Sequence, residues 1–136
     1  MGTWEKLKEI FSGKQQPEHL RRGALGENAA KRHLKKQGLK FLTANFADKH
    51  GEIDLIFRET ETLIFVEVKT RTHETFSRPA DAVDRDKQRR LFKTANTYLR
   101  KINYPEVYHR YDIVEVILTD GKVSEIRHLP DAFQPD

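Results

Sequence analysis

The sequence of 136 residues contains no cysteine and only one methionine and one tryptophan. Without cysteine, disulfide frameworks, thiolate zinc sites and cysteine nucleophiles are excluded. The chain also lacks a run of about 18 apolar residues, and it lacks a short apolar core behind a basic N-terminus. These absences argue against a membrane-spanning helix and a secretory signal, so we expect a cytoplasmic protein with no membrane partner.

Charge is plentiful but unevenly placed. Charged residues make up 34% of the chain against 37% hydrophobic residues, and the net charge is +4. Residues 1–50 carry a net +6 and residues 84–110 a net +5, whereas residues 51–83 carry −3 and residues 111–136 carry −4. Basic flanks suit a polyanionic partner, and an acidic centre suits a metal ion or a catalytic site.

The chain divides into an appendage, one domain and a tail. Residues 1–20 read as a short amphipathic helix, with Trp4, Leu7 and Phe11 on one face, followed by a polar linker. This segment can dock on the domain, on a partner protein or on nothing. Residues 21–130 form the predicted domain and residues 131–136 the tail.

The domain is predicted to be α/β. Helical periodicity covers residues 22–37, with Gly38 after its end, and residues 84–101, with Asp84 as N-cap. Strand patterns cover residues 39–46, 52–58, 62–70, 111–118 and 123–129, and Asp120–Gly121 suits a type I′ turn between the last two. Residues 72–83 read as a loop. The predicted order is αβββαββ.

Two adjacent strands carry acidic residues where apolar ones are usual. Glu67 and Lys69 share one face at the end of the apolar strand that includes Leu63 and Phe65. A two-residue turn at residues 60–61 would set Asp54 directly opposite Glu67. Opposed Cβ atoms lie about 5 Å apart, and two carboxylates there repel by roughly 3 kcal/mol at an effective dielectric near 20.

A divalent cation would convert this repulsion into a binding site. Carboxylate oxygens without thiolates or imidazoles favour Mg²⁺ or Mn²⁺. Lys69 would then orient or deprotonate a water, or stabilise a transition state, in metal-assisted phosphodiester hydrolysis. The prediction depends on the register, because a slip of one residue would turn Asp54 to the other face. The 60–61 turn lacks the usual Gly or Asn, but a longer loop of the same parity would preserve the site.

These residues resemble a known family. Asp54 followed by Glu67-Val68-Lys69 is similar to the PD-(D/E)xK nuclease signature. Residues 23–30, 51–56, 65–71 and 80–83 more closely resemble the YraN-like family of small bacterial proteins, which is related to archaeal Holliday junction resolvases. The likeness covers about residues 20–120. It implies a restriction-endonuclease-like αβββαβ core, a mixed central sheet flanked by helices.

The resemblance also implies roles for single residues. Asp54 and Glu67 match the metal-binding carboxylates, Lys69 matches the catalytic lysine, and Glu27 matches a helix acid that many relatives bring to the same site. Two features depart from the signature: Ile53 stands where a proline would precede Asp54, and residues 77–79 replace a glycine-containing turn. Family membership does not by itself establish activity.

Basic residues around this region are candidates for binding DNA. They are Arg71 and Arg78 in and beside the loop and Lys87, Arg89, Arg90 and Lys93 on the second helix. The alternatives are ordinary ones. Glu67 and Lys69 can form a solvated ion pair on an edge strand, Glu27 can be a first-turn helix acid, and the basic run can be a solvated helix face. Glu52 can be a surface residue at the start of its strand, and Gln88 can mark the boundary of the apolar helix face. Alternatively, each of the two can lie beside the site.

The leading hypothesis is a Mg²⁺- or Mn²⁺-dependent endonuclease acting on double-stranded or branched DNA. A branched substrate would favour a homodimer, because paired incisions need two sites. One alternative is a nucleic-acid-binding module without catalysis. Another is an adaptor that recruits a protein partner of a DNA repair or processing complex through residues 1–20.

Overall fold

We describe a computed structural model of the protein, which defines residues 17–72, 83–104 and 106–136. Its elements are α2 (Glu18–Lys36), β1 (Lys40–Asp48), β2 (Gly51–Glu59), β3 (Thr62–Thr72), α3 (Arg85–Lys101), β4 (Tyr108–Thr119) and β5 (Lys122–Phe133). The expected appendage helix in residues 1–16, and most of the expected loop, lie outside the described residues. None of the described helices is long and apolar enough to cross a membrane.

The five strands form one mixed sheet in the order β1-β2-β3-β4-β5. β3 and β4 are parallel and all other neighbours are antiparallel. A parallel pair needs a long crossover, and α3 lies within the connection from β3 to β4. The predicted α/β class with a mixed central sheet and flanking helices is confirmed.

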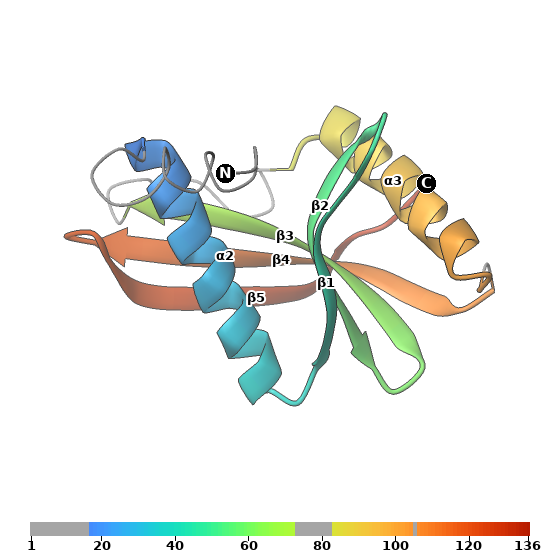
Figure 1. The fold of residues 1–136 in the computed structure, drawn as a ribbon, viewed down its shortest axis with the longest axis horizontal. Helices are drawn as coiled ribbons and strands as arrows, with labels where there is room; N and C mark the ends of the chain where they lie inside the picture. The colour runs from blue at the N-terminus through green and yellow to red at the C-terminus, as the bar shows by residue number, and fades with distance from the viewer. Residues whose placement is uncertain (1–16, 73–82, 105) are drawn as a thin grey trace, which may run out of the picture.

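The two helices cover opposite faces of the sheet (Figure 1). On one face, Ala30 and Leu34 of α2 pack against alternate residues of the strands, such as Val66 and Val114. On the other face, Leu91 and Leu99 of α3 pack against a second set, including Phe65 and Ile113. Each central strand is therefore apolar on both sides. A charged residue on such a strand is buried unless it lies near the strand end.

The predicted register of β2 against β3 is confirmed. Leu55 pairs with Val66 and Glu59 with Thr62, which leaves Thr60 and Glu61 as a two-residue turn. Thr60 adopts the positive φ of 52° that such a turn requires, although it is neither Gly nor Asn. The matched apolar faces of the two strands hold the pairing in place.

Most expected boundaries agree with the structure to within two or three residues. Asp84 caps α3 by accepting the N–H of Lys87, and Asp120 and Gly121 both have positive φ. Gly38, with φ of 92°, follows α2. α2 begins at Glu18, earlier than expected, so residues 18–20 belong to this helix and not to the appendage. Its first turn is exposed, including its one apolar residue, Leu20, and it lacks the apolar periodicity on which the prediction relied.

The turn between β1 and β2 is fastened to α3. The Asp48 carboxylate accepts hydrogen bonds from the hydroxyls of Thr94 (2.8 Å) and Thr97 (2.7 Å). It also accepts the backbone N–H groups of His50 (2.8 Å) and Gly51 (3.3 Å). Burial alone would raise the pKa of Asp48, but these four donors outweigh it and lower the pKa to about 2. The tip of the hairpin therefore lies beside α3 (Figure 1).

A buried acid, Asp112, joins β4 to β5 and, through His128, reaches the end of α2. Asp112 is 0% exposed and accepts hydrogen bonds from the Arg110 guanidinium (3.0 and 3.3 Å) and from the backbone N–H of Asp131 (2.9 Å). His128 Nε2 lies 2.7 Å from the same carboxylate, and its Nδ1 lies 3.2 Å from Gln37 at the end of α2. This acid is well partnered, and its role is to tie the helix to the sheet.

We predict that Asp48→Ala lowers the free energy of unfolding at pH 7 by about 1–3 kcal/mol, because the buried Thr94 hydroxyl and the turn amides lose a charged acceptor. The low pKa stabilises the fold above pH 4, and this contribution is lost as the pH falls towards 2. Urea unfolding measures the effect. Lys49→Ala, in the same turn but exposed, is the control and should change little. Equal stabilities of Asp48→Ala and wild type would contradict the fastening role.

We also predict that Gly26→Ala destabilises the protein by about 1–3 kcal/mol through overpacking. A Cβ at Gly26 would lie 1.8 Å from Thr70 Oγ1 and 3.0 Å from Thr70 Cβ, so α2 or β3 must shift. Gly23→Ala is a matched control on the same helix, because its Cβ would meet nothing within 4 Å. It should stabilise the helix by up to about 1 kcal/mol. Thermal unfolding that ranks the two variants in the reverse order would refute the close contact.

Candidate metal-binding site

The candidate site lies where β2 and β3 part. Their last backbone pair is Leu55 with Val66, and Asp54 and Glu67 are the next residues in this register. The Val68 N–H donates a 2.7 Å hydrogen bond to Asp54 Oδ2. The carboxylate thus takes the amide that the next rung of the ladder would have used, and the two strands are free to diverge around it.

The surroundings of Asp54 disfavour the ionised form of its carboxyl group. Burial raises its pKa most, and the nearby Glu67 carboxylate raises it further. The Val68 N–H lowers it, Glu27 adds a smaller increase and Lys87 a smaller decrease, and the resulting pKa is about 8. Near neutral pH, the metal-free site therefore retains a proton that a cation would have to displace.

Two further acids approach Asp54. Glu27 of α2 and Glu52 of β2 each place a carboxylate oxygen in a group with Asp54 whose atoms all lie within 4.8 Å of one another. The Asn45 amide donates to Glu52 Oε1 at 2.7 Å and to Glu27 at 3.4 Å. Burial raises the pKa of Glu27, the Asn45 bond lowers it, and Glu52 and Glu67 raise it again. The structure thus brings the predicted Glu27 to Asp54, and it places Glu52 in the group too.

Glu67 is buried, with 6% of its surface exposed, but its carboxylate interacts with a different partner. Lys87, in the first turn of α3, forms an ion pair with Glu67 Oε1. Among the described residues, Glu67 is not part of the three-carboxylate group, although its charge acts on both Asp54 and Glu27. The sequence pattern predicts Lys87 as a nucleic-acid-binding residue and does not indicate this contact with Glu67.

Beyond Glu67, β3 runs beside a buried acid of β4. Lys69 is opposite Glu115 in the parallel register, and Glu115 is 2% exposed. Glu115 Oε2 lies 3.0 Å from Arg71 Nε, and its Oε1 lies 3.2 Å from Arg127. Arg71, expected to contact phosphate, is 13% exposed and ion-paired here. Sequence reasoning missed Glu115, although an acid within an apolar strand is the same signal that drew attention to Glu67.

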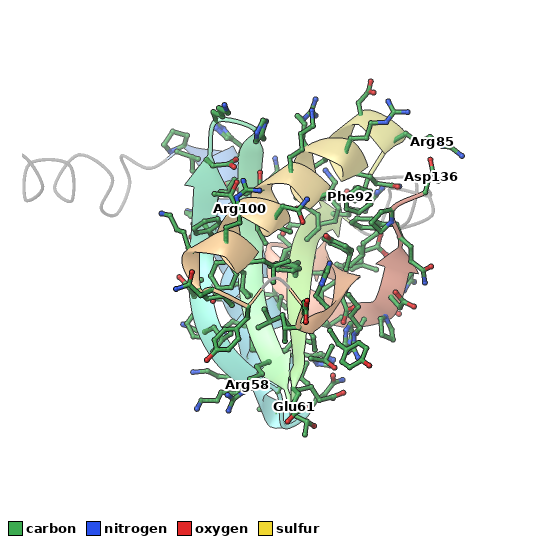
Figure 2. The ribbon with its side chains drawn as sticks, turned by 90° about the vertical axis from the view of Figure 1, so that its right-hand side faces the viewer. Arg58, Glu61, Arg85, Phe92, Arg100 and Asp136 are labelled. Atoms are coloured by element: carbon green, nitrogen blue, oxygen red, sulfur yellow. The ribbon has the colours of Figure 1, made fainter. Side chains whose placement is uncertain are left out.

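The other expected residues lie along α3 or outside the described chain. Arg89 is exposed and pairs with Asp86, Arg90 and Lys93 are exposed, and Gln88 donates to the Val83 carbonyl at 2.9 Å. Arg78 falls outside the described residues. Figure 2 shows α3 crossing this face, with Arg85 beside Asp136 at its N-terminal end.

A separate hollow lies away from these acids. A cavity of about 770 Å³ is lined by residues of the β2–β3 turn and of the C-terminal end of α3, including Arg58, Glu61, Tyr98 and Tyr104. Figure 2 shows Arg58 and Glu61 at the end of the molecule opposite Arg85. None of the site acids Glu27, Glu52, Asp54 and Glu67 lines this cavity, so chemistry, not cavity size, identifies the candidate site.

We predict that Asp54→Asn stabilises the metal-free protein at pH 8 by on the order of 2 kcal/mol, since ionising this buried carboxyl opposes folding. The raised pKa means that wild type loses stability as the pH rises from about 4 to about 8. The advantage of the variant should therefore vanish near pH 4. Urea unfolding in EDTA measures it, with the exposed Glu61→Gln as control. A variant less stable than wild type at pH 8 would overturn the assignment.

Comparison with known proteins identifies the family. The model of the uncharacterised protein family UPF0102 matches residues 26–116, which include every acid of the site. A UPF0102 protein of Caldanaerobacter subterraneus is 42% identical over 82% of this chain and 93% of its own length. One from Rhodococcus opacus is 38% identical over 85% and 98% of the two chains, and one from Vibrio campbellii is 46% identical over 66% and 75%. The chain therefore belongs to UPF0102, the YraN family that its motifs resemble.

Proposed function

We propose that this protein is a Mg²⁺- or Mn²⁺-dependent endonuclease that hydrolyses phosphodiester bonds of DNA. The observation that carries the proposal is the crowding of acids around Asp54. Burial and the neighbouring Glu67 carboxylate raise its pKa to about 8, and Glu27 and Glu52 lie within 4.8 Å of it. Such an arrangement costs folding free energy, and a bound divalent cation would relieve this cost.

The residues fit a hard divalent cation. The candidate ligands Asp54, Glu67 and Glu27 offer only oxygen atoms, and carboxylate oxygens of Asp54, Glu27 and Glu52 already lie within 4.8 Å of one another. A bound metal would lower the pKa of a water and screen the charge that develops on phosphate. Thiolates are absent from the chain, so a zinc site built on cysteine is excluded.

Lys69 is the candidate catalytic base or charge-stabilising group. It lies two residues after Glu67 on the same strand face and is half-buried beside Glu115. In hydrolysis, water adds to phosphorus, and the bond from phosphorus to the leaving sugar oxygen breaks. The Lys69 side chain would orient the water or stabilise the added negative charge on the phosphate.

The surfaces around the site suit a polyanion. Exposed Arg89, Arg90 and Lys93 lie on α3, and α2 carries a basic hollow lined by Lys31, Arg32 and Lys35. Contacts of this kind would supply sequence-independent affinity for DNA. The resemblance to Holliday junction resolvases favours branched DNA as substrate and a homodimer as the active form.

One observation favours a second candidate, a DNA-binding module without catalysis. Glu67 is already neutralised by Lys87, so the protein can fold with this carboxylate satisfied and without metal. Such a module would bind DNA with strong salt dependence and independently of EDTA.

The test is a cleavage assay on supercoiled, linear and four-way-junction DNA with Mg²⁺ or Mn²⁺. We predict cleavage that EDTA abolishes and that Lys69→Ala or Asp54→Ala reduces by about 100-fold or more. Lys122→Ala removes an exposed lysine of β5 and should retain activity. Cleavage that persists in both site variants would refute the proposal. Salt-sensitive binding without products would favour the binding module.

A further inference from the structure

The most unusual contact in the site is the ion pair between Glu67 and Lys87. Glu67 is 6% exposed, while the Lys87 side chain remains 32% exposed. The lysine thus reaches from the surface to a carboxylate that the proposed function assigns to the metal. Its ammonium also acts on Asp54, whose pKa it lowers.

The pair also determines which acids are gathered. Glu27, Glu52 and Asp54 form a compact group, and Glu67, held by Lys87, is not part of it among the described residues. A full set of Asp54, Glu67 and Glu27 around one ion therefore requires the Glu67 carboxylate to move toward the other acids, and this movement competes with the contact between its Oε1 and Lys87.

We infer that Lys87 is an internal competitor for the metal: its ammonium occupies Glu67 in the metal-free protein and must leave when the cation binds. This inference rests on the proposed metal site and adds a residue that the expected ligand set does not contain. It predicts that metal affinity is limited by the strength of the Glu67–Lys87 pair.

The local structure allows the side chain to leave without moving the helix. Asp84 accepts the backbone N–H of Lys87 at 2.9 Å, so the first turn of α3 is fixed by its cap. The lysine stem is long and flexible, and its ammonium is strongly hydrated, so solvent can receive it. Once released, the ammonium stands at the edge of the site, where an incoming phosphate oxygen can accept from it.

The first test is chemical labelling of lysines in the full-length protein, read by mass spectrometry. Acetylation of Lys87 should be slow without metal, because its ammonium is paired, and should rise several-fold on adding Mg²⁺. Lys101, exposed at the other end of the same helix, is the matched control and should not change. Unchanged or slower labelling of Lys87 at saturating Mg²⁺ would overturn the inference.

The second test is Mn²⁺ binding by calorimetry. Lys87→Met removes the competitor and keeps the apolar stem, so it should bind Mn²⁺ about fivefold more tightly than wild type, as expected for losing one partly exposed ion pair. Lys101→Met should bind like wild type. Circular dichroism and thermal melting verify that both variants fold.

The outcomes separate this inference from the proposal beneath it. If neither wild type nor Lys87→Met binds Mn²⁺, the metal site itself is refuted, and the inference with it. If both bind with equal affinity, or if Lys87→Met binds more weakly, the metal site stands and the competitor role is wrong.

Discussion

The register of β2 against β3 is the constraint on which the rest of the site depends. The two-residue turn at Thr60 and Glu61 fixes it, and the matched apolar faces of the strands maintain it. This register makes Asp54 and Glu67 the next pair after Leu55 and Val66, at the point where the strands diverge. A shift of one residue would turn Asp54 to the opposite face, and no arrangement of the helices would restore the acid group.

Buried acids of this protein fall into two classes. Asp112 receives Arg110, His128 and a backbone N–H, and these donors outweigh burial and lower its pKa. Asp54 is half-buried, but its neighbours include Glu67 and Glu27, and its pKa rises. Since burial alone would raise both, the difference lies in the partners. An acid without enough nearby hydrogen-bond donors and positive charges, such as Asp54, adds little to the stability of the fold and is a candidate for a functional role, such as binding a cation.

Local patterns in the sequence were sufficient for the elements and the β2–β3 register. Asp84, Gly38 and the Asp120–Gly121 turn act within a few residues, so they can be recognised without the fold. The contacts that the sequence did not indicate join distant segments. Glu52 meets Glu27 through the packing of α2, and Lys87 reaches Glu67 across the β3–α3 connection. The expected start of α2 is too late because its first turn is exposed and lacks the apolar periodicity of the rest of the helix.

The site carries more negative than positive charge, and this excess determines what it can bind. Asp54, Glu67, Glu27 and Glu52 supply four carboxyls, whereas Lys87 supplies one ammonium, which pairs with Glu67. The single positive charge of Lys87 neutralises only Glu67. Because the pKa of Asp54 is raised, protonation of Asp54 removes part of the remaining negative charge. A divalent cation carries twice the charge of the lysine and can bind several carboxylates at once. Without metal, the Lys87 ammonium and the proton retained on Asp54 offset part of the negative charge of the four acids. A single divalent ion can take over both of these roles.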